Sequence, residues 1–207
     1  MMAEQEHGHG HGANRNGWTA AKVRWLESYL EDAGLLDPGD VDDFLRSFSE
    51  RAKHENGARL VARAWVDPGF RNRLLSDANA AIAELGLEVG TSGATEELEL
   101  TVVENRAGHH HVVVCTLCSC YPLGLLGPSP GWYKSPWYRA EVVRDPRGVL
   151  RTFGVEIGAN TEISVLDSSA EMRYMVLPQR PARTEHLSET DLRALVTRNG
   201  LIGTALV

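Results

Sequence analysis

The chain has 207 residues, a formal net charge of −7 and 43% hydrophobic residues. This length suits one sizeable domain with an appended segment, and the apolar fraction suits a packed core. The acidic balance disfavours nucleic acid as a partner, because phosphate binding needs a basic surface. No apolar run is long enough to span a membrane, and residues 1–17 lack the apolar stretch of a secretory signal. We therefore expect a cytoplasmic protein with no membrane partner.

The first residues form a low-complexity tail that contains His7-Gly8-His9-Gly10-His11-Gly12. Alternating His and Gly can bind transition metals loosely, so the tail is either a solvated, disordered segment or a metal-delivery segment. We divide the chain into a disordered His/Gly-rich tail (1–17), a helical N-terminal arm (18–94) and an α/β metal-binding catalytic domain (95–207).

Helices are predicted throughout the arm. Apolar residues at helical spacing predict a first helix that ends near Gly34. Asp37-Pro38 and Asp67-Pro68 each combine an N-cap residue with a proline in the first turn, which starts the second and fourth helices. The third helix is expected at about 57–65, and the fourth continues to Gly86. A loop then follows.

The arm carries several large apolar side chains: Trp18, Trp25, Tyr29, Phe44 and Phe48. Separate helices cannot bury all of these on one another. The helices therefore pack either on the rest of the chain or on a partner subunit.

Strands and helices alternate in the second half. Strands are predicted at 98–103, 111–114, 162–166 and 172–177. The Pro/Gly-rich stretch 122–131 is predicted to be loop. Ser135-Pro136 and Asp145-Pro146 start short helices, and Ser188 opens a last helix that Asn199-Gly200 ends. The predicted class is α/β of the mixed α+β kind, with a helical N-terminal arm followed by layered sheets around a cysteine site.

The only three cysteines of the chain occur as Cys115-Thr116-Leu117-Cys118-Ser119-Cys120, a segment that we call the claw. Three thiols so close together, and odd in number, indicate a metal site rather than a disulfide framework. The sulfurs of Cys118 and Cys120 and the amide nitrogens of Ser119 and Cys120 can chelate in one plane, with the Cys115 sulfur on the axis. One position then stays open for water or substrate, as in catalytic sites.

Deprotonated amides need a strong Lewis acid such as cobalt(III) or iron(III). The electron-rich thiolates are then prone to oxidation to sulfenate and sulfinate, whose oxygens suit arginine partners. Arg106 lies nine residues before Cys115, so the sequence places no arginine beside the claw.

Two alternatives stay open for the cysteines. A structural zinc site could take its fourth ligand from His109, His110 or His111, although alternate residues of a strand face opposite sides. A redox switch through a Cys118–Cys120 disulfide would strain the bond geometry.

The segment Val112–Pro122 resembles the metal-binding signature of the nitrile hydratase α subunit in its cobalt form. Thr116 after the first cysteine and Tyr121 after the last are of the cobalt kind. The resemblance covers about Trp18 to Gly203, and its clearest further matches are Ala64–Pro68, Trp132–Lys134, Arg144–Arg147, Asp167–Arg173, Val176–Pro181 and Leu195–Arg198.

The resemblance implies hydration of a nitrile to an amide at one non-corrin, low-spin cobalt(III) per α subunit, with iron less favoured. Cys115, Cys118, Ser119 and Cys120 would hold the metal. Cys118, as a sulfinic acid, and Cys120, as a sulfenic acid, would be the catalytic cysteines, and water or the Cys120 sulfenate would attack the nitrile. The resemblance also implies an activator protein that inserts cobalt and an αβ heterodimer or higher assembly, whose β subunit supplies arginines to the oxidised cysteines.

The resemblance gives Asp167, Ser168, Ser169, Glu171 and Arg173 a role in supporting the site; an ordinary turn between strands is the alternative.

The chain departs from the family at two places. Leu123-Gly124 stands where the family usually has Trp-Pro, which would leave room for a larger nitrile, such as a heteroaromatic or nucleoside-sized one. Glu96 stands where the family commonly has Gln. It would act as a proton relay or alter the polarity of the pocket, and a solvated loop residue is the alternative.

Two other functions compete with nitrile hydration. A thiocyanate hydrolase subunit carries a similar cobalt claw and acts on a related C≡N group. A non-catalytic cobalt-binding or delivery protein is suggested by the His/Gly tail, although the open position of the claw favours catalysis.

Overall fold

The computed structural model describes residues 12–90, 98–118 and 120–207, with side chains from residue 17 onward. Contacts divide the chain into two units, Met1–Ser47 and Phe48–Val207. The domain boundary that we expect at residue 95 stays a prediction. No helix among the described residues is both long and apolar enough to cross a membrane.

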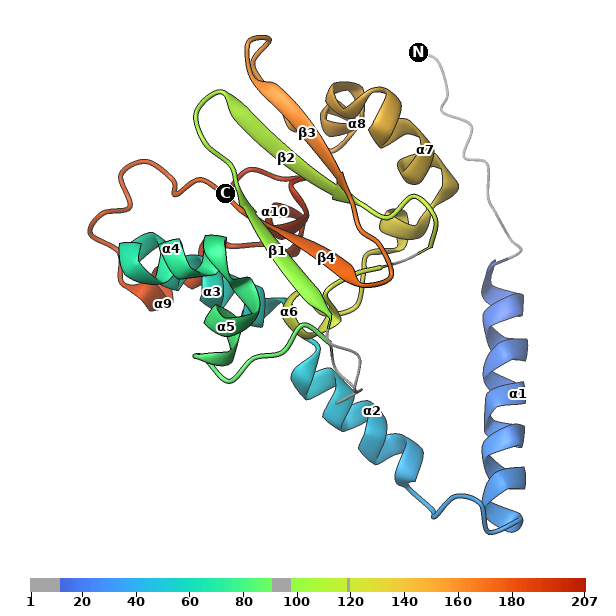
Figure 1. Cartoon of the computed structure of the whole chain (residues 1–207). Coiled ribbons are helices and arrows are strands. Elements are labelled where there is room, and N and C mark those ends of the chain that lie inside the picture. The colour runs from blue at the N-terminus through green and yellow to red at the C-terminus, as the bar shows by residue number, and fades with distance from the viewer. Residues whose placement is uncertain (1–11, 91–97, 119) are drawn as a thin grey trace, which may run out of the picture. The chain divides into compact units, whose positions relative to one another are not determined.

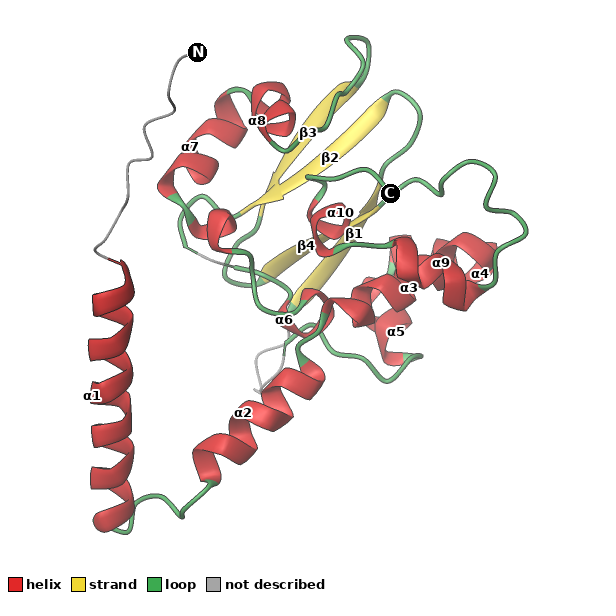
Figure 2. Ribbon diagram, turned by 180° about the vertical axis from the view of Figure 1, so that it is seen from behind, coloured by secondary structure: helices red, strands yellow, loops and turns green. Residues whose placement is uncertain are grey.

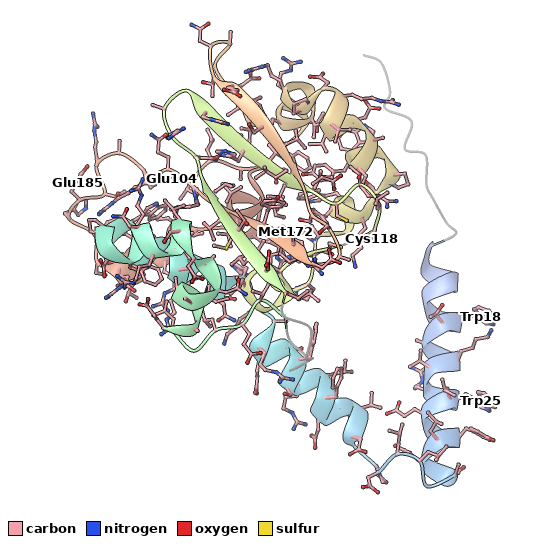
Figure 3. All side chains as sticks on the ribbon, in the orientation of Figure 1. Trp18, Trp25, Glu104, Cys118, Met172 and Glu185 are labelled. Carbon is pink, nitrogen blue, oxygen red and sulfur yellow. The ribbon has the colours of Figure 1, made fainter. Side chains whose placement is uncertain are left out.

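The N-terminal unit contains α1 (Gly12–Asp32) and the start of α2 (Asp40–Arg51). Gly34, with φ +66°, ends the first helix as predicted, since glycine takes the left-handed backbone at little cost. The second helix starts at Asp40, later than Pro38, because Gly39 has φ +93°. Trp18 and Trp25 project from α1 (Figure 3) and are 63% and 68% exposed.

Three helices open the larger unit: α3 (His54–Val66), α4 (Pro68–Ser76) and α5 (Ala78–Ala83). The Asp67 side chain accepts a hydrogen bond from Phe70 N and caps α4, as the Asp-Pro pair predicts. The single fourth helix that we expected up to Gly86 was wrong. Asp77 ends α4, and its side chain accepts from Ala80 N at 3.0 Å to cap α5.

Two parallel two-stranded sheets form the centre of this unit. Strand β1 (Glu99–Glu104) pairs with β4 (Met172–Leu177), and β2 (His109–Val114) pairs with β3 (Glu162–Asp167). Helices α4 and α5 contact β1, and α10 (Arg198–Ile202) contacts β2 and β4 (Figures 1 and 2). The mixed helix-and-sheet class is therefore confirmed.

The remaining elements are α6 (Leu123–Leu126), the 3-10 helix η1 (Gly131–Lys134), α7 (Pro136–Arg144), α8 (Pro146–Thr152) and α9 (Glu189–Leu195). The cap-plus-proline signals predicted α7 and α8 correctly. The assignment of 122–131 to loop was wrong where α6 and η1 form. Asn199-Gly200 does not end the last helix, because it lies inside α10, which Thr197 caps and Gly203 ends with φ +88°.

One hydrophobic core joins the sheets to α6, η1, α7, α8 and α10. It includes the fully buried Val112, Val114, Met175, Leu177 and Leu201. Burying such side chains contributes roughly 1.5–3 kcal/mol each. The core supports the carboxyl end of β2, from which the claw emerges.

Candidate metal centre

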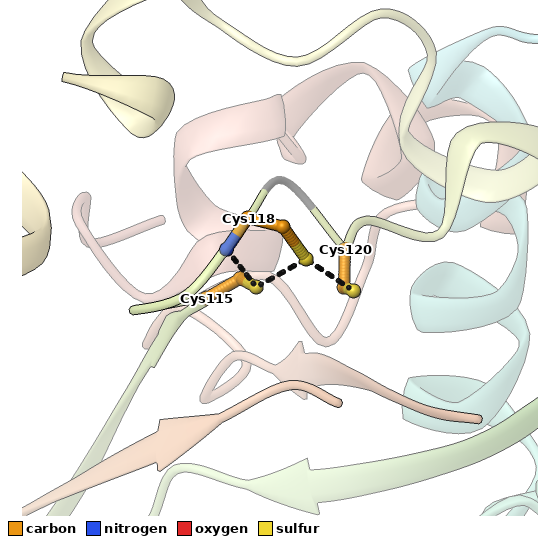
Figure 4. A group of neighbouring side chains, drawn as sticks. All are labelled: Cys115, Cys118 and Cys120. Carbon is orange, nitrogen blue, oxygen red and sulfur yellow. Dashed lines mark hydrogen bonds between the residues drawn. The ribbon is translucent and has the colours of Figure 1, made fainter. Parts of the chain in front are cut away.

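The three claw sulfurs lie together directly after β2 (Figure 4). Their atoms all fall within 4.8 Å of one another. Cys118 Sγ is 3.3 Å from Cys115 Sγ and 3.0 Å from Cys120 Sγ, and Cys118 N donates to Cys115 Sγ at 3.4 Å. No disulfide joins these cysteines, since a disulfide holds its two sulfurs at about 2.05 Å.

The three cysteines differ in exposure. Cys115 is 1% exposed, Cys120 is half-buried and Cys118 is exposed. Burial, followed by the sulfurs of Cys118 and Cys115, raises the pKa of Cys120 to about 12. A metal ion reverses this preference, because a coordinating thiol gives up its proton.

The parallel pairing of β2 and β3 brings Asp167 to the claw. Val114 and Asp167 are register partners at the carboxyl ends of the two strands. Asp167 Oδ1 accepts from Thr116 N at 2.9 Å, and Asp167 Oδ2 accepts from Thr116 Oγ1 at 2.5 Å. This carboxylate therefore orients the first turn of the claw, although the two residues are 51 positions apart.

The turn between β3 and β4 holds the other predicted supporting residues. Ser168 is buried, and its N donates to Val114 O at 2.8 Å. Ser169 Oγ accepts from Met172 N at 3.1 Å, and the Glu171 side chain is exposed. These contacts also suit an ordinary turn, so a role for this turn at the metal stays a prediction.

Arg173 lies directly after this turn, at the start of β4, and carries its charge toward the claw. Its guanidinium donates to backbone carbonyls, among them Ala170 O at 3.0 Å and Ser169 O at a shorter distance. Its charge also acts to lower the pKa of Cys120, against the effect of burial.

Sequence reasoning missed a second arginine, Arg139, whose Nη1 lies 3.4 Å from Leu117 O and 3.5 Å from Cys118 O. The expectation that the chain places no arginine beside the claw was therefore wrong. Arg139 follows Cys120 by 19 residues, and only the packing of α7 brings it back. Its position after the Ser135-Pro136 helix start was the one available signal.

Two buried tyrosines also hold the claw backbone. Tyr138 OH donates to Val113 O at 2.7 Å, and Tyr133 OH donates to Cys120 O at 3.1 Å. Burial raises the pKa of both phenols well above the ordinary value, so both remain donors at neutral pH.

Tyr121 and Leu123 begin the segment after the claw. Tyr121 is buried, with its ring edge against Tyr133 at a centroid distance of 5.0 Å. Its hydroxyl has no hydrogen-bond partner among the described residues. Leu123 opens α6 and is half-buried against the core.

Two predicted site residues, Ser119 and Glu96, lie outside the described residues.

The three histidines that we weighed as zinc ligands lie on β2. His109 and His111 stack on each other, with ring centroids 4.3 Å apart, and His110 lies buried between Asn105 and Gly203. Among the described residues, the one group of potential ligand atoms from three or more His, Cys, Asp or Glu residues is that of the three cysteines.

The donor chemistry of the claw fits a soft or borderline transition metal. Three sulfurs converge, and the surrounding contacts hold the backbone between them. The mixed fold and this triple-cysteine cluster are compatible with a protein that holds a metal ion in a cysteine claw.

Comparison with known proteins gives the family. The family model described as nitrile hydratase, alpha chain, matches residues 18–205. The low-molecular weight cobalt-containing nitrile hydratase subunit alpha of Rhodococcus rhodochrous is 49% identical over 187 residues, which cover 90% of this chain and 88% of that protein. The thiocyanate hydrolase subunit gamma of Thiobacillus thioparus is 43% identical over 155 residues, 72% of this chain and 64% of that one.

Solved structures agree. A double mutant of the Fe-type nitrile hydratase from Comamonas testosteroni Ni1 superimposes with a TM-score of 0.84 at 38% identity, over 92% of this chain and 91% of that one. This chain belongs to the nitrile hydratase alpha-chain family.

Proposed function

We propose that this chain is the α subunit of a cobalt-type nitrile hydratase, which converts a nitrile to the corresponding amide. The gathering of the three claw sulfurs within 4.8 Å carries this proposal. Relatives named as cobalt-containing nitrile hydratase subunits support cobalt over iron, although an Fe-type structure is also similar.

The sulfurs of Cys115, Cys118 and Cys120 and the amide nitrogens of Ser119 and Cys120 would hold cobalt(III). When bound, the metal supplies Lewis-acid activation of the C≡N group. Asp167 orients Thr116, and Tyr133 holds the Cys120 carbonyl, so the chain's own contacts keep the ligands in place. Cys118 as sulfinic acid and Cys120 as sulfenic acid complete the proposed site.

A β subunit is part of the proposal. Leu117, at the tip of the claw, is 91% exposed, and Trp18 and Trp25 of α1 are also exposed. Large exposed apolar groups of this kind support a covering subunit. That subunit would add arginines to the oxidised cysteines, and an activator protein would insert cobalt. The three cysteines form no disulfide, which suits the reducing cytoplasm.

The substrate is proposed to be a nitrile with a bulky or heteroaromatic group, because Leu123 replaces the tryptophan usual in the family. Turnover of a small aliphatic nitrile should be compared with that of a heteroaromatic one. We expect a higher kcat/KM for the heteroaromatic nitrile, and Leu123→Trp should shift the preference toward the small one. A clear preference of the unchanged chain for the small nitrile would contradict the substrate proposal.

The activity itself is tested by measuring amide release from a nitrile against carbonyl sulfide release from thiocyanate. Release of carbonyl sulfide would favour the alternative of a thiocyanate hydrolase subunit. The similarity to the gamma subunit of that enzyme supports this alternative. The mass of the peptide that contains Cys115–Cys120 gives an independent result. Added oxygens on two cysteines are expected, whereas unmodified thiols with bound zinc would contradict the proposal.

A further inference from the structure

The segment η1–α7 contacts peptide carbonyls of the claw and of the end of β2 before it. Tyr133 and Tyr138 donate to the carbonyls of Cys120 and Val113, and Arg139 lies beside those of Leu117 and Cys118. We propose that Arg139 is a positioning residue that fixes the Leu117 and Cys118 carbonyls and offsets the negative charge that metal binding places on the Cys118 carbonyl. The inference rests on the proposed function and adds a cation supplied within the chain.

The position of Arg139 is set by a well-anchored helix. Ser135 caps α7 by accepting from Tyr138 N at 3.1 Å. The Tyr138 side chain is fully buried, and its hydroxyl binds Val113 O, two residues before Cys115. Arg139 is the next residue on this helix, so its guanidinium reaches the claw from a fixed base.

The charge of Arg139 is available to the claw. None of the carboxylates among the described residues forms an ion pair with it. Its Nε is buried without a hydrogen-bond partner in the described part of the chain. At 3.4 and 3.5 Å the contacts to the carbonyl oxygens are long for hydrogen bonds, so they act chiefly as charge–dipole attraction.

The chemistry of the peptide group gives these contacts a consequence. The carbonyl of Cys118 belongs to the same peptide as the amide nitrogen of residue 119, which is a proposed ligand. A peptide nitrogen that binds a metal shares its negative charge with the carbonyl oxygen of that peptide. A guanidinium beside this oxygen therefore stabilises the metal-bound claw more than the metal-free one.

The chain offers a matched control in Arg147 on α8. Its guanidinium also donates to backbone carbonyls, those of Ile157, Gly158 and Thr161, at 2.6 to 2.9 Å. Loss of Arg147 removes contacts between a guanidinium and backbone carbonyls, but it leaves the contacts to the claw carbonyls in place. An effect that is specific to Arg139 must therefore come from the claw.

The test uses the full chain produced with its co-purifying subunit and cobalt(II) chloride in the medium. Arg139→Met, Arg139→Lys and Arg147→Met are compared by cobalt content per chain, by the sulfur-to-cobalt absorption bands and by the claw-peptide mass. Arg139→Met should lower by about 10-fold the chelator concentration that removes half of the cobalt, as for other residues that support metal ligands. Arg139→Lys should recover part of this loss, and Arg147→Met should match the unchanged chain.

Three results would overturn the inference: cobalt retention and absorption bands of Arg139→Met equal to those of the unchanged chain, an equal loss in Arg147→Met, or no recovery in Arg139→Lys. Failure of the proposed function looks different, because the unchanged chain would then form no amide from a nitrile, whether or not it held cobalt.

Discussion

Gly124 allows a sharp test of how the segment after the claw is built. Its N donates to Val89 O at 3.0 Å, and its carbonyl accepts from Asn56 Nδ2 at 2.7 Å. A Cβ placed on Gly124 would lie 2.5 Å from Gly90 O and closer still to Glu88 O, below the 3.0 Å that real Cβ atoms keep. The proline usual in the family at this position would also lack the N–H.

The expected cost of Gly124→Ala follows from these contacts. Overpacking against backbone costs about 1–3 kcal/mol, and a weakened hydrogen bond to Val89 adds about 1 kcal/mol. Helix propensity acts the other way, since alanine in α6 would favour the helix by up to about 1 kcal/mol. We expect a net loss of roughly 1–3 kcal/mol in the free energy of unfolding, or a fall in Tm of about 2–12 °C.

The assay is thermal and urea unfolding beside Gly131→Ala. A Cβ on Gly131 meets no atom within 4 Å, and the backbone of Gly131 is not left-handed. This control therefore measures the effect of replacing glycine by alanine without a steric clash. A Tm for Gly124→Ala equal to or above that of Gly131→Ala would refute the packing argument.

Three further predictions concern neighbouring contacts. Thr116→Val removes the hydrogen bond from the Thr116 hydroxyl to Asp167. We expect about 1 kcal/mol less stability and a lower cobalt content, and a cobalt content equal to that of the unchanged chain would contradict this. Burial lowers the pKa of His110, so the unfolded chain binds a proton at this residue more readily than the folded chain. Stability therefore falls as the pH falls below about 6.5, and the urea midpoints at pH 7.5 and 5.5 should differ less in His110→Gln than in the unchanged chain. Tyr138→Phe leaves Val113 O without this donor and should cost about 1–2 kcal/mol; an unchanged urea midpoint would contradict it.

Local signals in the sequence predicted the helix starts well. Asp67, Ser135 and Asp145 each accept a hydrogen bond from the backbone N–H three residues later, and each precedes a proline. These interactions depend on a few neighbouring residues, so they can be recognised without the fold. The break at Asp77 was missed because Ala78, and not a proline, follows this cap residue, although Asp77 also accepts from the backbone N–H three residues later. The short helix α6 was missed because packing and not local pattern decides it.

The claw was also available from the sequence, since its three cysteines lie within six residues and chelation is a local property of that spacing. The resemblance to the family started from the same segment and extended over about Trp18 to Gly203. What surrounds the claw was decided by the tertiary structure. Asp167 reaches Thr116 through the register of two parallel strands, and Arg139 reaches Cys118 O through the packing of α7. Contacts between residues so far apart in the chain depend on topology and packing, which no short-range pattern encodes.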